Sequence, residues 1–296
     1  MRAETYWRAA LARSAQAQAS GALVPLSTER LDLPELAPFV LRRLVSRTPI
    51  HLRADGPRPN PFLPWEAELE VASLGDDHVL LLNKFPVQPA HLLVITRRWQ
   101  PQAGWLGLAD WQAVTRLSSD CGGLWFFNSC AAAGASQPHR HLQLLPRASG
   151  EPSCPLAPLL RQQLQARESS HHGHLPADQG FDPWPWAYAL SRRCDPCDPL
   201  ELGRLYLRHA ELLELGKPGQ EPQPRHPYNL LFDDAWLLTV RRRQEHCAGF
   251  SLNALAFAGY LLATEGSQTD WLRQRGPWAL LQAVAWPRPA APHRAP

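Results

Sequence analysis

Apolar and polar positions alternate in two separate parts of the chain, and this alternation predicts β-strands. Residues 68–71 and 78–83 are expected to form strands joined by a Gly-Asp-Asp turn, and 91–96 is expected to complete a buried hairpin with 78–83. Residues 226–242 repeat the order of strand, turn and strand. Each hairpin has an asparagine in one strand and an Arg-Arg pair at the end of the other. We therefore expect a degenerate duplication with two half-sheets, in which only the first keeps its chemistry.

Helical periodicity occupies much of the remaining sequence. Residues 1–48 are predicted to form helices with a connection between them, and further helices are predicted over 108–117 and 200–215. Residues 125–129 are predicted as a strand. Residues 147–185 are rich in proline, glycine and histidine, which favours an irregular connection between two halves of the chain.

The composition is that of a globular protein with a sizeable core. The 296 residues are 45% hydrophobic and 19% charged, with a formal net charge of +3. Because there is no long run of lysine or arginine, nucleic-acid binding is not required, whereas a compact anionic substrate is compatible with this charge. We therefore expect small-molecule partners and no nucleic acid.

The sequence predicts neither export nor membrane insertion. Its first 20 residues contain arginines and alanines without a continuous apolar segment, so they are not a secretory signal. An organelle transit peptide is the alternative to the packed helix that Glu4 and Trp7 favour. Residues 247–264 carry no charge, but their polar residues and glycines favour a buried segment over a membrane span. We expect a cytoplasmic protein with no membrane partner.

Six cysteines show no evenly spaced framework, so reduced thiols are expected. Cys194 and Cys197 form a Cys-x-x-Cys pair, and His171, His172 and His174 lie upstream. This set keeps a structural zinc site open as an alternative, although a second cysteine pair and the usual histidine spacing are missing. No His-x-Glu precedes the pair, which excludes a zinc-dependent nucleobase deaminase.

The sequence most suggestive of chemistry is residues 134–143, Gly-Ala-Ser-Gln-Pro-His-Arg-His-Leu-Gln. Pro138 disfavours a helix at the residue before it, and the alternation after it predicts a short strand. Because side chains alternate between the faces of a strand, His139, His141 and Gln143 are expected on one face. The small residues upstream allow the backbone to approach a ligand, and free N–H groups in such a turn bind anions. This arrangement suits a phosphate.

The string resembles the transferase form, His-x-His-x-Gln, of the histidine-triad superfamily. Within that superfamily it is similar to the diadenosine tetraphosphate (Ap4A) phosphorylases, also called ATP adenylyltransferases. Two further strings carry the resemblance, Asn83-Lys84-Phe85-Pro86 in the first hairpin and residues 250–260 near the other end. The weaker similarity extends over nearly the whole chain, including residues 21–28 and Asn-Pro-Phe-Leu-Pro at 60–64.

The resemblance implies an α+β fold, with a histidine-triad-like duplicated antiparallel sheet and flanking helices. This architecture is similar to the half-barrel of galactose-1-phosphate uridylyltransferase. Residues 1–150 would hold N-terminal helices and the catalytic half, and 151–185 the Pro/His-rich connection. Residues 186–296 would form a degenerate half similar to the C-terminal domain of ATP adenylyltransferases.

In the family motif the second histidine is the nucleophile, which here is His141. Its other ring nitrogen must be held by a backbone carbonyl or another acceptor to set the tautomer. His139 is expected to orient the site and to help with the leaving phosphate, and Gln143 with the N–H groups of residues 134–136 to stabilise charge on the phosphoryl oxygens. Histidine-triad hydrolases carry a histidine in place of Gln143. Glutamine cannot titrate, so the motif favours a phosphate acceptor over water.

The resemblance also implies substrate contacts. Asn83 is expected on the ribose, Lys84 on the polyphosphate, and Arg47 and Asn128 at the phosphates. The remaining expected contacts lie in the small-residue turn and in the C-terminal string: Ala133, Gly134, Ala135, Ser136, Asn253, Ala254, Leu255 and Tyr260. Family members often carry a lysine just after this string, where this chain has Thr264. No protein metal ligands and no covalently bound cofactor are expected, and a divalent cation such as Mg²⁺ would accompany the nucleotide.

These expectations predict reversible phosphorolysis of Ap4A by inorganic phosphate to ATP and ADP, through an adenylyl-histidine and with ping-pong kinetics. A dinucleoside polyphosphate hydrolase, an ADP-sulfurylase-type enzyme or a hexose-phosphate nucleotidyltransferase is the alternative on the same scaffold, and phosphate dependence and products distinguish them. A non-catalytic nucleotide sensor would leave His141 unlabelled. A zinc-dependent interaction module would be recognised by metal analysis.

Overall fold

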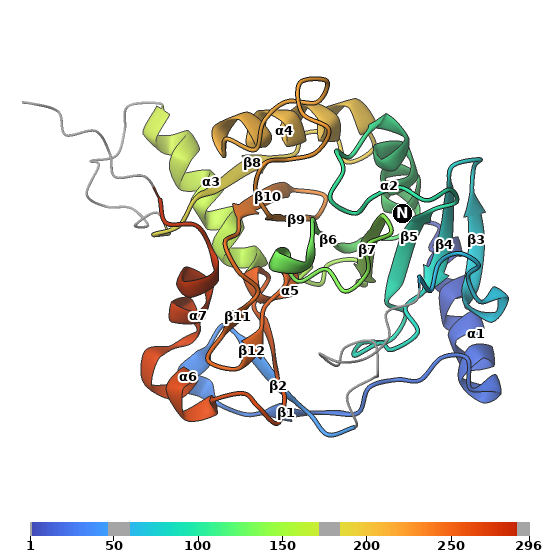
Figure 1. Cartoon of the computed structure of the whole chain (residues 1–296), viewed down its shortest axis with the longest axis horizontal. Coiled ribbons are helices and arrows are strands. Elements are labelled where there is room, and N and C mark those ends of the chain that lie inside the picture. The colour runs from blue at the N-terminus through green and yellow to red at the C-terminus, as the bar shows by residue number, and fades with distance from the viewer. Residues whose placement is uncertain (1, 47–59, 172–183, 289–296) are drawn as a thin grey trace, which may run out of the picture.

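The computed structural model describes residues 2–46, 60–171 and 184–288, and its centre is one eight-stranded sheet (Figure 1). The strand order is β3-β4-β5-β7-β6-β9-β10-β8, and every neighbouring pair is antiparallel. The strands are β3 (Glu70–Leu74), β4 (His78–Leu82), β5 (Leu92–Thr96), β6 (Gly123–Asn128), β7 (His141–Pro146), β8 (Tyr188–Arg192), β9 (Tyr228–Phe232) and β10 (Trp236–Arg241). The expected antiparallel sheet is confirmed.

The two hairpins that the sequence predicts are β4–β5 and β9–β10. They belong to one continuous sheet, because β6 of the first half pairs with β9 of the second, from Trp125 opposite Phe232 to Asn128 opposite Asn229. The expected two half-sheets are therefore adjacent parts of a single sheet, joined edge to edge by the pairing of β6 with β9. The junction between them places the end of β6 beside the start of β9.

Three helices cover one face of this sheet. They are α1 (Thr5–Ser20), α2 (Leu108–Asp120) and α4 (Pro199–Leu212), and their apolar residues form a core with the inward side chains of the strands. Trp111 and Tyr206 illustrate the contact: both are buried, and their rings lie 5.4 Å apart between α2 and α4. The helices predicted over 108–117 and 200–215 are confirmed.

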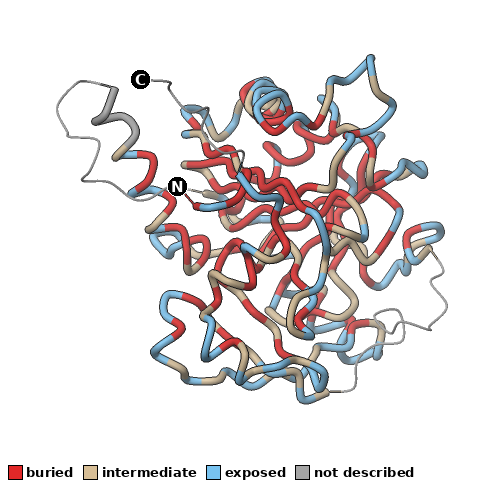
Figure 2. The backbone as a smooth tube through the Cα atoms, turned by 60° about the vertical axis from the view of Figure 1, so that its left-hand side comes forward, coloured by how far each residue is buried: buried red, intermediate tan, exposed pale blue. Residues whose placement is uncertain are grey.

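The other face is covered by α3 (Ala157–His171), α5 (Ala254–Phe257) and α7 (Pro277–Val284). The prediction of an irregular connection is wrong over 157–171, which forms the helix α3. Leu160 and Leu164 are buried in the core on this face of the sheet, and this packing stabilises the helix. Figure 2 shows the buried strands in red at the centre, between less buried connections.

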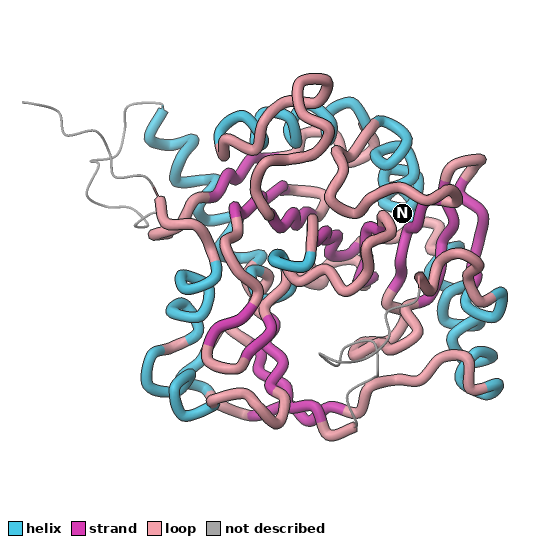
Figure 3. The backbone as a smooth tube through the Cα atoms, viewed as in Figure 1, coloured by secondary structure: helices cyan, strands magenta, loops and turns pink. Residues whose placement is uncertain are grey.

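A small sheet lies apart from the main one, at the bottom of the view in Figure 3. It consists of β1 (Thr28–Leu31), β2 (Val40–Leu44) and β13 (Tyr260–Ala263), with the short helix η1 (Pro34–Leu36) between β1 and β2. The helical prediction over the second part of 1–48 is therefore wrong: β2 pairs in parallel with β13, more than 200 residues away, and this pairing decides the local structure.

The remaining elements connect these layers. They are η3 (Ala67–Leu69), η4 (Ala131–Ala133), the hairpin β11 (His246–Cys247) and β12 (Phe250–Ser251), and α6 (Thr269–Arg275). None of the helices in the described part of the chain combines the length and apolar character needed to span a bilayer.

Candidate active site

The predicted histidine strand is β7, and it places two of the three motif side chains on the sheet face that α3, α5 and α7 cover. In the sheet, Gln143 lies between Leu93 of β5 and Phe126 of β6. His141 is opposite Ile95 of β5. His139 precedes β7, so the strand begins two residues later than predicted. Polar side chains thus interrupt an otherwise apolar face at the middle of the first half.

The ring of His141 is buried and chemically poised. Its Nδ1 lies 2.8 Å from the carbonyl oxygen of His139. A carbonyl only accepts hydrogen bonds, so Nδ1 carries the proton and Nε2 has a lone pair. Nε2 has no hydrogen-bond partner among the described residues, and it does not belong to the fully buried atoms without partners. Burial lowers the pKa of His141 to about 4, which keeps the imidazole neutral near pH 7.

His139 acts on His141 through its backbone, while its own ring is fully engaged. Its Nε2 donates to the carbonyl oxygen of Thr96 at 2.8 Å, and its Nδ1 accepts from the amide of Asn60 at 3.2 Å. Burial lowers the pKa of His139, and the residue has no exposed surface. The ring therefore has no free nitrogen for a leaving phosphate in this arrangement, and orientation of the nucleophile is the role that fits.

Phe62 covers the two histidines. Its ring centre lies 5.6 Å from that of His139 and 5.5 Å from that of His141. Phe62 belongs to the Asn-Pro-Phe-Leu-Pro string at 60–64, whose Asn60 also contacts His139. This string thus excludes water from one side of the imidazole pair.

The amide of Gln143 is oriented by His91, a residue that the sequence analysis missed. The backbone N–H of Phe85 donates to Oδ1 of Asn83 at 3.0 Å, so Nδ2 of Asn83 is the atom that donates to Nδ1 of His91, also at 3.0 Å. Nε2 of His91 then carries the proton and donates to Oε1 of Gln143 at 2.9 Å.

This series of hydrogen bonds from Asn83 through His91 to Gln143 leaves the NH₂ group of Gln143 without a partner among the described residues. Burial lowers the pKa of His91 to about 4, so its ring is neutral near pH 7. A neutral ring has one donor and one acceptor nitrogen, which fixes the direction of the hydrogen bonds from Asn83 to Gln143. The site therefore offers a hydrogen-bond donor from Gln143 beside the free lone pair of His141. No motif pointed to His91, because in the sequence it is only the first residue of a predicted apolar strand.

The small-residue turn is built differently from the expectation. Ala131–Ala133 form a short 3₁₀ helix, and Gly134 follows with φ 85°. The N–H groups of Gly134 and Ala135 donate to carbonyl groups within the turn, at 2.8 and 3.0 Å. The expected binding of phosphoryl oxygens by these two N–H groups is therefore corrected. Of the three expected donors, Ser136 alone has an N–H without a partner among the described residues.

Gly134 also brings the two halves of the chain together. A Cβ atom at this position would lie 2.6 Å from Cβ of Asn253. Asn253 accepts a hydrogen bond from the N–H of Leu255 at 2.9 Å and so caps α5. Ala254 is buried, and Leu255 is half-buried. The predicted turn and the predicted C-terminal string are therefore in direct contact.

Asn128 joins the same junction through both its side chain and its backbone. Its Oδ1 accepts from Nδ2 of Asn229 at 2.8 Å and from the N–H of Ala254 at 2.9 Å. Gln102 donates to the carbonyl oxygen of Asn128 at 2.7 Å and accepts from the N–H of His141 at 2.8 Å. The side-chain oxygen of Asn128 is thus occupied, and the residue positions β7 instead of facing a ligand. Gln102 was also not among the residues that the sequence predicted for the site.

Lys84 and Tyr260 are less deeply buried than the histidines. Nζ of Lys84 pairs with Oε1 of Glu66 at 2.5 Å, and both side chains are partly exposed. Tyr260 is half-buried, and its hydroxyl accepts from Arg147 at 3.0 Å. Arg47 lies outside the described residues.

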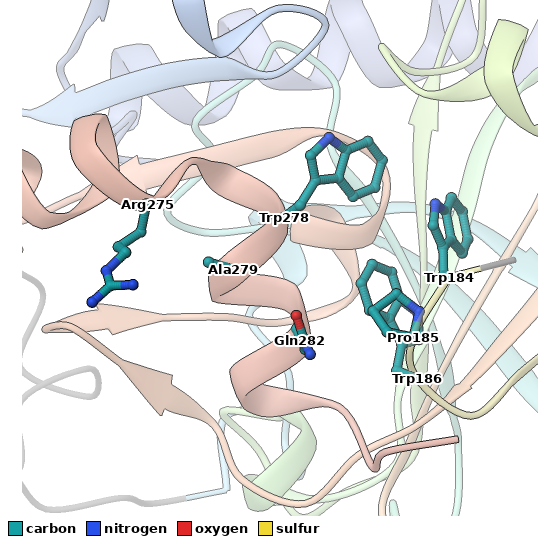
Figure 4. A pocket seen from close by; sticks show the side chains of 7 residues that line it. All are labelled: Trp184, Pro185, Trp186, Arg275, Trp278, Ala279 and Gln282. Atoms are coloured by element: carbon teal, nitrogen blue, oxygen red, sulfur yellow. The ribbon is translucent and has the colours of Figure 1, made fainter. Parts of the chain in front are cut away.

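Metal-ligand geometry is not found in the described ranges, where no group of three or more His, Cys, Asp or Glu residues could hold an ion. Cys194 and Cys197 are exposed there. A cavity of about 280 Å³ lies between the segment before β8 and the helices α6 and α7 (Figure 4), and it is lined by Trp184, Pro185, Trp186, Arg275, Trp278, Ala279 and Gln282. None of the histidine-strand residues lines it.

A continuous antiparallel sheet with a paired-histidine strand of the His-x-His-x-Gln type defines a protein of the histidine-triad class. The Ap4A phosphorylase N-terminal domain matches residues 1–162, and the ATP adenylyltransferase C-terminal domain matches residues 182–287. The chain therefore belongs to the Ap4A phosphorylase family, and the resemblance drawn from the three strings is confirmed.

Two curated relatives come from Saccharomyces cerevisiae. Protein APA1 is 41% identical over 73 residues, which are 22% of this chain and 23% of that protein. Diadenosine 5′,5‴-P1,P4-tetraphosphate phosphorylase 2 is 32% identical over 106 residues, or 31% of this chain and 33% of that protein. These matches span between about a quarter and a third of the length of the curated relatives.

Solved structures extend the likeness over the whole fold. The crystal structure of yeast Ap4A phosphorylase Apa2 has a TM-score of 0.73 at 19% identity, covering 98% of this chain and 100% of that chain. The structure of Apa2 in complex with Ap4A has a TM-score of 0.68 with the same coverage and identity. At this identity the likeness establishes a common fold.

Proposed function

We propose that this protein is a nucleotidyltransferase that cleaves Ap4A with inorganic phosphate to give ATP and ADP, reversibly. The observation that carries the proposal is the state of His141: a neutral imidazole whose Nδ1–H is held by a carbonyl and whose Nε2 lone pair has no partner among the described residues. Relatives named as Ap4A phosphorylases, and the fold shared with yeast Apa2, support it.

In the first step Nε2 of His141 attacks the α-phosphorus of Ap4A. A nitrogen–phosphorus bond forms, the bond to the bridging oxygen breaks, and ATP leaves while the adenylyl group stays on the ring. In the second step an oxygen of inorganic phosphate attacks the same phosphorus, and ADP leaves with the ring restored. The Nδ1–H bond to the carbonyl of His139 stabilises the positive charge on the ring between the two steps.

Gln143 suits this chemistry as a donor with no proton to exchange. Its free NH₂ group can bind a non-bridging phosphoryl oxygen, on which negative charge accumulates in the transition state. A glutamine cannot remove a proton from water. Inorganic phosphate arrives already ionised, so it needs no base, and this difference favours phosphorolysis over hydrolysis.

The substrate lies along the surface formed by Asn83, Lys84, Ser136 and the C-terminal string at 253–260 in this proposal. Lys84 would exchange its partner Glu66 for a phosphate oxygen. Mg²⁺ would enter with the nucleotide, because the described residues offer no cluster of ligands for it. We infer a cytoplasmic enzyme with small-molecule substrates and no nucleic-acid or membrane partner.

The test is turnover of Ap4A with and without phosphate, by the wild type and by His141→Ala, with products separated by chromatography. We expect ATP and ADP from the wild type with phosphate, and a radioactive adenylyl group on the wild-type protein when phosphate is omitted. Equal turnover by the variant would contradict the nucleophile, and turnover to ATP and AMP without phosphate would indicate a hydrolase.

A further inference from the structure

A buried arginine of the second half lies directly behind the small-residue turn. Arg242 follows β10, and its side chain has no exposed surface. Its guanidinium is surrounded by neutral oxygen atoms, namely the carbonyl groups of Val284 (3.1 Å), Gln244 (2.7 Å), Leu252 (2.8 Å) and Ala133 (3.5 Å), and Oδ1 of Asn229. The guanidinium also lies 5.3 Å from the ring centre of Phe257.

None of these acceptors is a carboxylate. Within the described ranges no ion pair forms at Arg242, whereas its neighbour Arg241 pairs with Glu214 at 2.9 Å. Burial lowers the pKa of Arg242 to about 10, which still leaves the group charged near pH 7. The carboxylate of Glu245 favours the charged form of Arg242 electrostatically, but it accepts a hydrogen bond from Ser251 and forms no ion pair with the guanidinium in the described ranges. A buried cation without a direct ion pair is unfavourable.

Hydrogen bonds connect this cation to the nucleophile. Asn229 accepts from Arg242 and donates to Oδ1 of Asn128 at 2.8 Å. Asn229 also donates to the carbonyl of Ala133 at 2.8 Å, at the start of the turn. From Asn128 the connection continues through Gln102 to the backbone of His141. The charge therefore sits behind the turn and at the end of a buried network that reaches β7.

We propose that Arg242 is the positive group with which the second half of the sheet selects an anionic phosphate chain at the turn 131–136. This inference rests on the proposed function, which places the substrate beside Ser136 of this turn. Arg242 is a positioning residue: it fixes the carbonyl groups of Ala133 and Leu252, and so the contact between the turn and the C-terminal string. The phosphate chain adds negative charge to that of Glu245, which acts on the guanidinium without direct contact.

The expected signature is an affinity that depends on the charge of the ligand. Adenosine, AMP, ADP and ATP share one base and ribose and differ in negative charge, so dissociation constants for this series isolate the electrostatic contribution. Adenosine is measured by competition against a fluorescent ATP analogue. Without the cation, binding should weaken more for each added phosphate.

Arg242→Gln removes the charge and keeps an amide, and Arg242→Lys keeps the charge and removes the planar fork. For Arg242→Gln we expect adenosine to bind within about twofold of the wild type, AMP about threefold more weakly and ATP about tenfold or more. Arg242→Lys should keep most of the charge dependence. The matched control is Arg241→Gln, which removes the same charge from a buried arginine that already has a carboxylate partner, and it should bind the whole series like the wild type.

An equal loss of affinity for adenosine and ATP in Arg242→Gln would show a purely structural role and overturn the proposal, as would unchanged binding of ATP. If circular dichroism shows that Arg242→Gln is unfolded, the test is made on the wild type by NMR, with the ¹⁵N resonance of the Arg242 Nε–H as the readout. This resonance is assigned because it is missing from the spectrum of Arg242→Lys. AMP and inorganic phosphate should shift this resonance and adenosine should not, and a resonance that none of them shifts overturns the proposal. Binding is measured without turnover, so a failure of phosphorolysis alone would contradict only the proposed function.

Discussion

The two halves of the sheet use polar side chains on the same face in opposite ways. In the first half, Nε2 of His141 and the NH₂ group of Gln143 have no hydrogen-bond partner in the described ranges. In the second half, Asn229 and the guanidinium of Arg242 are enclosed by acceptors and donors from three segments of the chain. The comparison teaches that direct contact with a reacting group is possible where the hydrogen-bond network ends on a free atom, and that side chains act by positioning their neighbours where the network closes.

The same contrast separates two buried histidines. His141 has one engaged and one free nitrogen, whereas His209 on α4 contacts Ser191 through Nε2 and Thr239 through Nδ1, both at 2.9 Å. His209 lies in the core of the opposite face, so it can contribute to stability without touching a ligand.

The largest expected effect follows from this pair. His141→Ala should reduce kcat about 10⁴-fold or more, because the group that would carry the adenylyl intermediate is removed. His209→Ala should lower the melting temperature and leave kcat per folded molecule within about twofold. Steady-state kinetics and thermal unfolding of both variants test the comparison, and it fails if the two variants lose kcat to the same degree.

The next effect concerns the orientation of Gln143. His91→Phe removes the donor that holds Oε1, so the amide of Gln143 can turn away, and we expect kcat to fall about 10- to 100-fold with KM changed little. Gln143→Ala should cause a loss at least as large. His91→Gln can still donate to Oε1 and should recover part of the rate.

Initial rates over a range of Ap4A and phosphate concentrations separate kcat from KM in these variants. A rise of KM alone in His91→Phe would indicate that His91 only shapes the binding surface. A ratio of phosphorolysis to hydrolysis that falls along with kcat would support the role of Gln143 in favouring phosphate.

A third effect tests the contact between the halves. Gly134→Ala introduces a Cβ 2.6 Å from Cβ of Asn253 at a positive φ, so we expect a loss of about 2–3 kcal/mol in the free energy of unfolding and a higher KM for Ap4A. Gly21→Ala is the matched control: its φ is 78°, but nothing lies within 4 Å of the added Cβ, and about 1 kcal/mol is expected. Urea unfolding measures both, and equal losses would show that backbone strain alone acts at Gly134.

Much of the site could be predicted because its central part is local in sequence. The alternation after Pro138 was sufficient to place His141 and Gln143 on one face, and the order of apolar strands gave both hairpins. What could not be predicted depends on partners far away. His91 orients the amide of Gln143, which lies 52 residues later, and no pattern in the sequence connects the two residues.

The errors have the same origin. The turn at 134–136 was expected to expose its N–H groups, but a 3₁₀ turn closes on itself and uses two of them. Asn128 was expected at the phosphates, and Asn229, 101 residues away, occupies its side-chain oxygen. Composition and periodicity describe which face a residue occupies, and the distant strand that packs against it decides which of its atoms remain free.

The smallest effect concerns pH. His141 and His91 have pKa values lowered by burial to about 4, whereas in the unfolded chain they bind protons near pH 6.5. Between these values the unfolded state binds more protons than the folded state, so stability rises as pH rises from 4 to 6.5 and is then level with respect to these two groups. Activity should likewise be level from about pH 6 upward and fall as His141 is protonated toward pH 4. The melting temperature measured from pH 4.5 to 7.5 should have a shallower slope in His91→Phe than in the wild type. Identical slopes in His91→Phe and the wild type would contradict the assignment of His91 as a buried neutral ring.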